Sequence, residues 1–278
     1  MKFCLLLFFI FETFFVAAQN AIRCAHSHND YLKHRPLQGA LANGFKSIEI
    51  DVFLNKTELK VAHVPLALGS KKNIDELYLR PLFARIEKNN GHVYENDSTP
   101  LVLMIDFKTG GSATYQRLLQ YIAPYQKYIA HYDSLGYYHM GAVAINISGA
   151  VPWEALNLAT ETRYCTGDGS IDSRNDSLVS ATILQRVSSP YSHYFRWRGL
   201  GHMPATEKQL LKKLVQEAHA HSRQIRFYAA PQKQQVWREL LDAGVDWINI
   251  DKHEKFVRFF TIYSALQVDK GGCHCVRM

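Results

Sequence analysis

Short apolar runs alternate with longer amphipathic segments along the chain from residue 21 to residue 266. The apolar runs are bounded by turn residues, which predicts strands at 21–25, 47–53, 60–63, 101–107, 141–147, 163–166, 225–229 and 247–250. The intervening segments carry apolar residues at helical spacing and predict helices at 37–42, 74–89, 115–129, 207–222, 232–243 and 254–266. This alternation is typical of parallel α/β architecture, and a count near eight strand units favours a (β/α)₈ TIM-type barrel over an open sheet.

The segment 151–199 fits the repeat poorly, so we expect the barrel to be irregular there. It contains a polar stretch at 167–176 and an aromatic-rich stretch at 191–197. In a parallel barrel the catalytic residues sit at the carboxyl ends of the strands. The polar residues that interrupt or end the apolar strands are therefore the first candidates for chemistry.

The first 18 residues have a different pattern. Lys2 precedes an almost wholly apolar run, and Val16-Ala17-Ala18 places small residues at a cleavage position. This pattern predicts a secretory signal peptide. The alternative of a membrane anchor is disfavoured, because the run falls short of the roughly 20 residues of a span and contains Glu12. We expect residues 19–270 to form one barrel domain, and the protein to be exported to the periplasm or the exterior.

The charge balance excludes some partners. The chain has 32 Lys and Arg against 25 Asp and Glu, a net charge of +7, with the basic residues scattered along the predicted helices. Such scatter argues against a nucleic-acid partner but allows a transient contact with a membrane surface. No pattern indicates an obligate protein partner. Cys273, His274 and Cys275 lie in a tail, 271–278, which we expect to be flexible rather than a metal site.

Two carboxylates lie within one apolar strand. Glu49 and Asp51 alternate with Ile48, Ile50 and Val52, so both project from the same face. A charged pair inside a barrel needs a compensating cation, and Ca²⁺ and Mg²⁺ prefer carboxylate oxygens. A salt-bridged pair without a metal is an equal alternative on this motif alone.

Other polar residues end neighbouring strands. Asp106 and Lys108 share a face at the end of the strand 101–107, where they could provide a metal ligand and a phosphate contact or form a plain salt bridge. His63 ends another strand, although a lone histidine is more often structural. His26 and His28 follow the first strand.

Together these segments resemble the superfamily of phosphatidylinositol-specific phospholipases C and glycerophosphodiester phosphodiesterases. Residues 28–32, HNDYL, are similar to a segment of eukaryotic phospholipases C, and residues 44–52, GFKSIEIDV, to one of glycerophosphodiesterases. Residues 103–110, LMIDFKTG, resemble a strand of spider-venom sphingomyelinase D enzymes, and residues 244–251, GVDWINID, the end of glycerophosphodiesterases. Within the superfamily, the segments HSHNDY, YLRPL and RFYA resemble the branch that contains altered inheritance of mitochondria protein six.

The resemblance implies a role for each candidate. His28 and His63 would be the acid–base pair, with His28 preferred as the base and His63 as the acid. Ca²⁺ or Mg²⁺ would be held by Glu49, Asp51 and Asp106, with Asn29 as a neutral ligand, and the substrate would contact Lys108, His26, Tyr228 and Asp251. His26 is the alternative to His28 as the first catalytic histidine. The substrate would be a small phosphodiester or a lipid head group, cleaved by its own hydroxyl to a cyclic phosphate or directly by water.

The chain also departs from typical glycerophosphodiesterases. Asn29 stands where arginine usually follows the first histidine, and Asp106 stands where glutamate is usual. These departures weaken the inference of substrate but leave the catalytic set complete. The rival interpretations are a metal-dependent sugar lyase or hydrolase on the same barrel, and a catalytically silent protein that binds lipid head groups or glycans. Retention of both histidines and all three carboxylates disfavours the silent binder.

Overall fold

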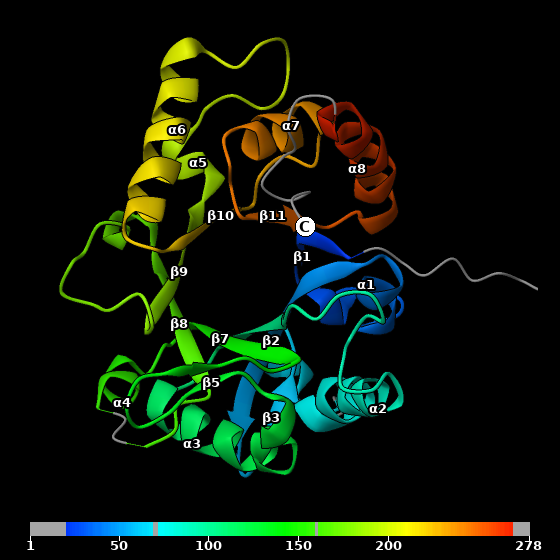
Figure 1. Cartoon of the computed structure of the whole chain (residues 1–278), viewed down its shortest axis with the longest axis vertical. Coiled ribbons are helices and arrows are strands. Elements are labelled where there is room, and N and C mark those ends of the chain that lie inside the picture. The colour runs from blue at the N-terminus through cyan, green and yellow to red at the C-terminus, as the bar shows by residue number, and fades with distance from the viewer. Residues whose placement is uncertain (1–20, 69–71, 159–160, 269–278) are drawn as a thin grey trace, which may run out of the picture.

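A closed barrel of parallel strands forms the centre of the molecule (Figure 1). The structure is a computed structural model and describes residues 21–68, 72–158 and 161–268. Within these residues eight parallel strands pair in sequence order and the last returns to the first, which confirms the predicted TIM-type barrel. They are β1 (Ile22–Ser27), β2 (Phe45–Asn55), β4 (Leu101–Phe107), β7 (Val143–Gly149), β8 (Cys165–Ser170), β9 (Leu184–Pro190), β10 (Gln224–Tyr228) and β11 (Trp247–Ile250).

Helices surround this ring and cover its outer surface (Figure 1). They are α1 (Gln38–Ala42), α2 (Arg80–Lys88), α3 (Gly111–Ile122), α4 (Trp153–Asn157), α5 (Tyr191–Tyr194), α6 (Ala205–Ala220), α7 (Gln234–Asp242) and α8 (His253–Val268). Shorter turns are η1 (Asp30–Leu32), η2 (Pro65–Ala67), η3 (Asp75–Leu79), η4 (Ala123–Tyr128) and η5 (Ile171–Ser173). The predicted helix 74–89 divides into the π-helical turn η3 and α2, and Pro81 lies in the first turn of α2.

Three short strands lie outside the barrel wall. β2 runs on beyond the ring and pairs antiparallel with β3 (Glu58–Val61), from Val52 opposite Val61 to Asn55 opposite Glu58. The sequence predicts a strand at residues 60–63, and the structure has one at residues 58–61, outside the ring. β5 (His131–Tyr132) and β6 (Tyr138–His139) form a separate antiparallel pair.

Two barrel strands differ from the sequence prediction. β8 continues through Gly167, Asp168 and Gly169, which were predicted as part of an irregular polar stretch, and β9 was not predicted at all. Both strands carry polar side chains toward the barrel interior, including Asp168 and Ser188, which line a pocket there. An apolar pattern in the sequence indicates a strand whose buried face packs in an apolar core. A strand whose buried face is polar lacks this pattern.

The register of the sheet places the predicted carboxylates side by side. Asp51 of β2 lies opposite Asp106 of β4, and Glu49 lies opposite Met104. Phe107 of β4 lies opposite Gly149 of β7. Because side chains alternate along a strand, Ile48, Ile50 and Val52 pack in the surrounding core while the carboxylates face the interior.

Candidate active site

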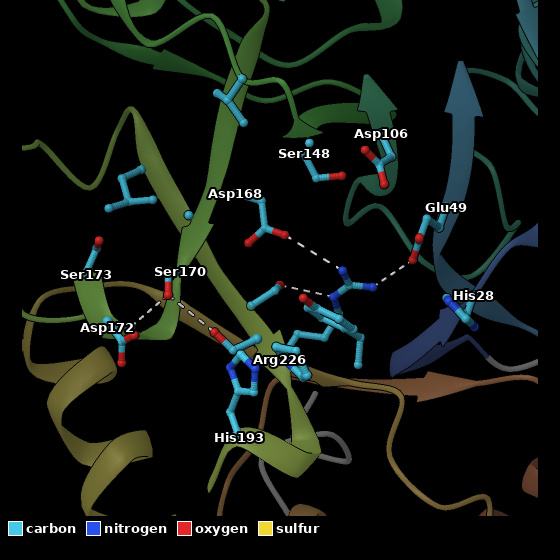
Figure 2. Close-up of a pocket in the computed structure, with 18 of the residues that line it drawn as sticks. His28, Glu49, Asp106, Ser148, Asp168, Ser170, Asp172, Ser173, His193 and Arg226 are labelled. Atoms are coloured by element: carbon cyan, nitrogen blue, oxygen red, sulfur yellow. Dashed lines mark hydrogen bonds and ion pairs between the residues drawn. The ribbon is translucent and has the colours of Figure 1, made fainter. Parts of the chain in front are cut away.

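A large pocket opens at the carboxyl end of the barrel (Figure 2). Its volume is about 890 Å³, which is within the range of sites that hold small organic ligands. The barrel strands bring residues far apart in the sequence to its wall. The predicted site residues that line it are His28, Asn29, Glu49, His63, Asp106, Lys108 and Tyr228.

Three carboxylates meet at one side of this pocket. One oxygen each from Glu49, Asp51 and Asp106 lies within 4.8 Å of the others. Oδ1 of Asp51 and Oδ1 of Asp106 are both buried without a hydrogen-bond partner. Buried carboxylate oxygens are normally satisfied by a donor or a cation. The donor set is all oxygen and anionic, so it fits a hard divalent ion such as Ca²⁺ or Mg²⁺.

Gly149 forms the floor beneath Asp106. Its φ of +71° is a conformation that side chains rarely adopt. A Cβ added there would collide with Oδ1 of Asp106 and lie 2.6 Å from the carbonyl oxygen of Phe107. Glycine at this position therefore keeps open the space around the unpartnered Asp106 oxygen.

Lys108 bridges two of the carboxylates. Its Nζ lies 2.7 Å from Asp106 Oδ2 and 3.1 Å from Asp51 Oδ2. Burial by itself would lower the pKa of Lys108, but Asp106 and then Asp51 outweigh it and raise that pKa. The pKa of Asp51 is raised by burial, despite hydrogen bonds from Tyr31 and Lys108. The Lys108 ammonium thus forms salt bridges with the Oδ2 atoms of both aspartates. The Oδ1 atom of each aspartate has no hydrogen-bond partner and could bind a cation.

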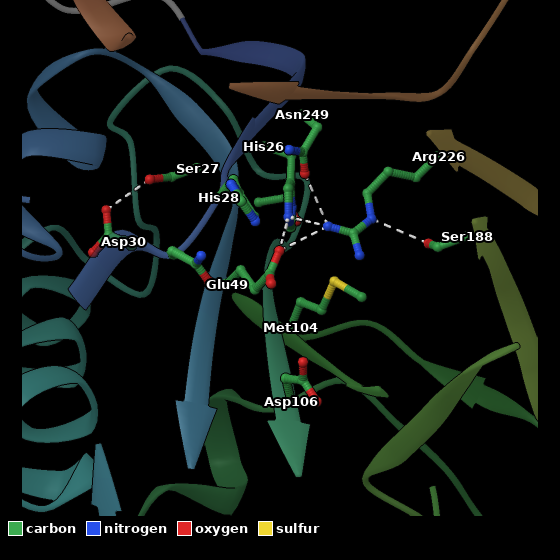
Figure 3. A network of polar contacts seen from close by, with 12 residues as sticks. His26, Ser27, His28, Asp30, Glu49, Met104, Asp106, Ser188, Arg226 and Asn249 are labelled. Carbon is green, nitrogen blue, oxygen red and sulfur yellow. Dashed lines mark hydrogen bonds and ion pairs between the residues drawn. The ribbon is translucent and has the colours of Figure 1, made fainter. Parts of the chain in front are cut away.

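Glu49 is held from behind by two side chains. Its Oε2 lies 2.7 Å from Nη1 of Arg226 and 2.8 Å from Nε2 of His26 (Figure 3). Burial opposes ionisation of Glu49, but Arg226 and then His26 outweigh it and hold its pKa below the usual range. His26 is fully buried, and Nδ1 contacts Ser47 Oγ at 2.7 Å. Burial and then the charge of Arg226 lower its pKa to about 3, so the ring is neutral.

His26 therefore does not reach the pocket as the structure places it. The predicted substrate contact would require an exposed ring, whereas His26 has none of its surface exposed and orients Glu49. His26 lies within β1 and His28 just beyond it, and of these two histidines His28 is the one that lines the pocket.

His28 is oriented by Asp251 at the end of β11. Its Nδ1 lies 2.7 Å from Oδ1 of Asp251, which leaves Nε2 as the ring nitrogen available for proton transfer. The hydrogen bond with His28 is the main reason that the pKa of Asp251 is lowered. Asp251 was predicted to contact substrate, but it lies behind His28 and is not part of the pocket wall.

His63 approaches the carboxylates from another side through Tyr31. The Tyr31 hydroxyl donates to Asp51 Oδ2 at 2.7 Å and accepts from Nδ1 of His63 at 2.9 Å. Burial and the neighbouring Asp51 raise the pKa of Tyr31 strongly, so the hydroxyl stays protonated. The His63 side chain is 55% exposed. Like His28, it is held through Nδ1 and keeps Nε2 for chemistry.

A buried network fixes the loop that follows β1. Asp30 accepts hydrogen bonds from Ser27 Oγ at 2.7 Å, the Leu37 amide at 2.5 Å and the Tyr78 hydroxyl at 2.9 Å. Asn29 adopts a left-handed backbone, with φ of 46°, which turns the chain between His28 and this network. The position of His28 therefore depends on a rigid loop.

Comparison with known proteins places the chain in a family. Residues 14–168, more than half of the 278 residues, match the family model of the AIM6-like phosphodiesterase domain. The chain belongs to the AIM6-like phosphodiesterase domain family.

Curated relatives agree with this assignment. Altered inheritance of mitochondria protein 6 of Eremothecium gossypii is 28% identical over 270 residues, covering 84% of this chain and 68% of the relative. The protein of the same name from Lachancea thermotolerans is 27% identical over 281 residues, covering 85% and 65%.

A crystal structure of a glycerophosphodiester phosphodiesterase from Agrobacterium tumefaciens is also similar, with a TM-score of 0.50 and 14% identity, covering 85% of this chain and 98% of that one. A second, from Parabacteroides distasonis, has a TM-score of 0.51 and 14% identity, covering 87% and 99%. At this identity the likeness shows a shared barrel fold.

The predicted location of this AIM6-like chain is wrong. The curated relatives from Eremothecium gossypii and Lachancea thermotolerans have a name that refers to the inheritance of mitochondria, which contradicts a periplasmic or extracellular protein. The family match also begins at residue 14, inside the segment predicted to be cleaved. Residues 1–18 and the tail 271–278 lie outside the described residues. No helix among the described residues is long and apolar enough to span a membrane.

Several residues of the AIM6-like site were missed in the sequence. Arg226 and Asp168 lie in the middle of the pocket (Figure 2). Tyr31 links His63 to Asp51. Arg226 could have been found, because it precedes Tyr228 by two positions on a predicted strand and so shares its face. Asp168 had no such signal, since its strand was not predicted to extend so far.

Most of the aromatic residues in the second half of the chain pack in the core. Of the aromatic residues in the second half of the chain, Tyr228 lines the pocket, together with Trp153 from α4. Tyr191 and Phe195 are buried in the core instead. Gly167 makes room for Trp153, because a Cβ on it would strike the indole ring.

We expect His253 to make folding of the AIM6-like domain pH-dependent. Its Nε2 lies 2.8 Å from Ser27 Oγ, and burial, followed by the charge of Lys33, lowers its pKa from 6.5 to about 4. The unfolded chain therefore binds a proton that the folded chain does not, so stability falls as pH drops from 6.5 to about 4. In urea unfolding between about pH 7 and pH 5, His253→Gln should flatten this slope by about 1 kcal/mol per pH unit.

The control for that measurement is His202→Gln, which removes an exposed histidine. An equal slope in wild type and His253→Gln would show that His253 is not the group that titrates.

Proposed function

We propose that this chain is a metal-dependent phosphodiesterase that cleaves a glycerophosphodiester or a phospholipid head group with two histidines as acid and base. The observation that carries the proposal is the pairing of His28 and His63 around one carboxylate cluster. Each ring is held through Nδ1 by a different oxygen, from Asp251 and from Tyr31. The relatives that share the barrel and are titled glycerophosphodiester phosphodiesterases support this ester class.

His28 is the proposed general base. Asp251 accepts a hydrogen bond from Nδ1–H of His28, which fixes the tautomer whose Nε2 accepts a proton. The nucleophile is a hydroxyl of the substrate or a water molecule. When the ring takes up the proton, the carboxylate of Asp251 stabilises the imidazolium.

His63 is the proposed general acid for the leaving group. The Tyr31 hydroxyl accepts a hydrogen bond from Nδ1–H of His63 and donates one to Asp51, so the ring is tied to the carboxylate cluster. The exposed position of His63 places it at the open side of the pocket, where an alkoxide can leave and be protonated.

The phosphoryl charge is met by the cation position and by Lys108. Asp51, Asp106 and Glu49, with Asn29 at the pocket wall, would hold a Ca²⁺ or Mg²⁺ ion, which supplies Lewis-acid neutralisation of a phosphoryl oxygen. Lys108 adds a direct ammonium contact. A silent binding protein would need neither histidine held in a defined tautomer, and so the geometry favours an enzyme over that alternative.

The reaction class is tested by a phosphodiester screen on the full chain. We expect release of alcohol from bis(p-nitrophenyl) phosphate or glycerophosphodiesters with Ca²⁺ or Mg²⁺, and its loss with EDTA. His28→Ala and His63→Ala should each lower kcat by about 100-fold or more, since acid–base catalysis contributes about 10²–10⁴-fold.

The matched control is His193→Ala, a histidine that lines the same pocket away from the carboxylates. Turnover of sugars or keto acids in place of phosphodiesters would favour the rival lyase or hydrolase. Absence of turnover across the screen would overturn the phosphodiesterase proposal.

The cation position is tested by titration without any substrate. Isothermal calorimetry with Ca²⁺ and Mg²⁺ should show one site, and Asp51→Asn or Asp106→Asn should weaken it about tenfold or more. Gly149→Ala should weaken it as well, because the added methyl displaces Asp106 Oδ1. Asp172→Asn, a carboxylate in the same pocket outside the cluster, is the control. Equal affinity in the wild type, Asp51→Asn, Asp106→Asn and Gly149→Ala would exclude this site.

Asp251→Asn tests the orientation of His28. The amide can donate to Nδ1 and so favours the wrong tautomer, and we expect kcat to fall by about 100-fold or more with little change in KM. Asp251→Glu keeps the acceptor and should restore part of the loss. A KM effect with unchanged kcat would instead assign Asp251 to substrate binding.

A further inference from the structure

Arg226 occupies the centre of the pocket. It projects from β10 between Glu49 on one side and Asp168 on the other (Figure 2). Its side chain is only 5% exposed, yet it belongs to the pocket wall. A guanidinium at this depth faces whatever ligand lies over the carboxylate cluster.

The guanidinium is fixed by several partners. Nη1 donates to Glu49 Oε2 at 2.7 Å and to Asn249 Oδ1 at 3.1 Å, and Nε donates to Ser188 Oγ at 3.1 Å (Figure 3). Nη1 also lies 2.8 Å from Nε2 of His26, and the neutral ring donates its Nε2 hydrogen to Glu49. The bonds to Glu49, Asn249 and Ser188 therefore use the Nε hydrogen and both Nη1 hydrogens of the five that an arginine carries. A group held in this way loses little entropy on meeting a ligand.

Nη2 is the nitrogen that remains. Among the described residues it has no hydrogen-bond partner, and its recorded ion pair is with Asp168 Oδ2 at 3.8 Å, beyond hydrogen-bond length. We infer that Nη2 of Arg226 binds a non-bridging oxygen of the phosphodiester, opposite the oxygen that meets Lys108. This inference rests on the phosphodiesterase proposal and adds a contact to the same site.

The charges around Arg226 are compatible with an anionic ligand. Glu49 and Asp168 are offset by Arg226 and the neighbouring buried Arg186. Asp51 and Asp106 carry two negative charges, and Lys108 offsets one of them, which leaves a net charge of −1. A divalent cation makes the site singly positive, which matches the single negative charge of a phosphodiester.

Arginine suits this position better than lysine. Its planar fork can hold Glu49 and a phosphoryl oxygen at the same time from two different nitrogens. A lysine ammonium at the same place would have to choose between them, because its one nitrogen is a point charge. The contact therefore depends on the shape of the side chain as well as its charge.

The test is binding of dimethyl phosphate, a phosphodiester monoanion, to the full chain at saturating Ca²⁺ or Mg²⁺. The cation affinity of each variant is measured first. An indirect effect, in which the substitution disturbs Glu49 and weakens cation binding, is thereby separated from loss of the phosphate contact. We expect Arg226→Lys to weaken dimethyl phosphate by about 10- to 100-fold, as loss of a charge-assisted hydrogen bond does. With bis(p-nitrophenyl) phosphate as substrate, added guanidinium should restore part of kcat/KM to Arg226→Ala.

Arg186→Lys is the matched control. Arg186 is a second buried arginine of the barrel interior, 1% exposed, and is not part of the pocket wall. It should change dimethyl phosphate affinity less than about twofold while costing comparable stability. Equal losses in both variants would mean general damage to the barrel and would overturn the contact.

Other outcomes are equally decisive. If Arg226→Lys binds dimethyl phosphate with wild-type affinity, the inference is refuted. It is also refuted if the loss of dimethyl phosphate affinity disappears once the cation site is saturated. Failure of the wild-type chain to bind dimethyl phosphate would refute it too. Arg226-dependent binding without turnover of any phosphodiester would support the contact while overturning the proposed catalytic function.

Discussion

The buried ion pair between Arg226 and Glu49 is the interaction on which the interior of this barrel depends. Most barrels of this kind fill their centre with branched apolar side chains, whereas here the carboxyl half contains Glu49, Arg226, Asp168 and Arg186. Charges at this depth persist only when they are paired and hydrogen-bonded. Arg226 meets that demand for Glu49 from across the ring, with help from His26 and Asn249.

That pairing also explains why one loop carries so much of the site. From His26 near the end of β1 to Tyr31 in the turn that follows, each side chain has its own partner. His26 reaches inward to Glu49, Ser27 and Asp30 lock the turn, His28 meets Asp251, and Tyr31 spans Asp51 and His63. Alternation along the strand sends the first two to opposite faces. The left-handed Asn29 then redirects the chain toward the pocket.

The sequence predicted what local periodicity can express. Strands 101–107 and 247–250 have the predicted bounds because all but one residue of each is apolar. Glu49, Asp51 and Asp106 were found because each breaks an apolar run. Arg226, Asp168 and Tyr31 were not, since their importance comes from partners on other strands. Their roles depend on which strands lie opposite one another in the closed ring, and period and propensity do not encode this.

The two histidines that flank the carboxylates rest on different supports. His28 is anchored to the ring itself, through Asp251 at the end of β11. His63 follows β3, the hairpin partner of the stretch of β2 that extends past the ring. In the proposed mechanism, a change in the length of that hairpin would shift the general acid on the leaving-group side and leave the general base in place. On that mechanism, different leaving alcohols could be accommodated by altering one surface hairpin, without rebuilding the barrel.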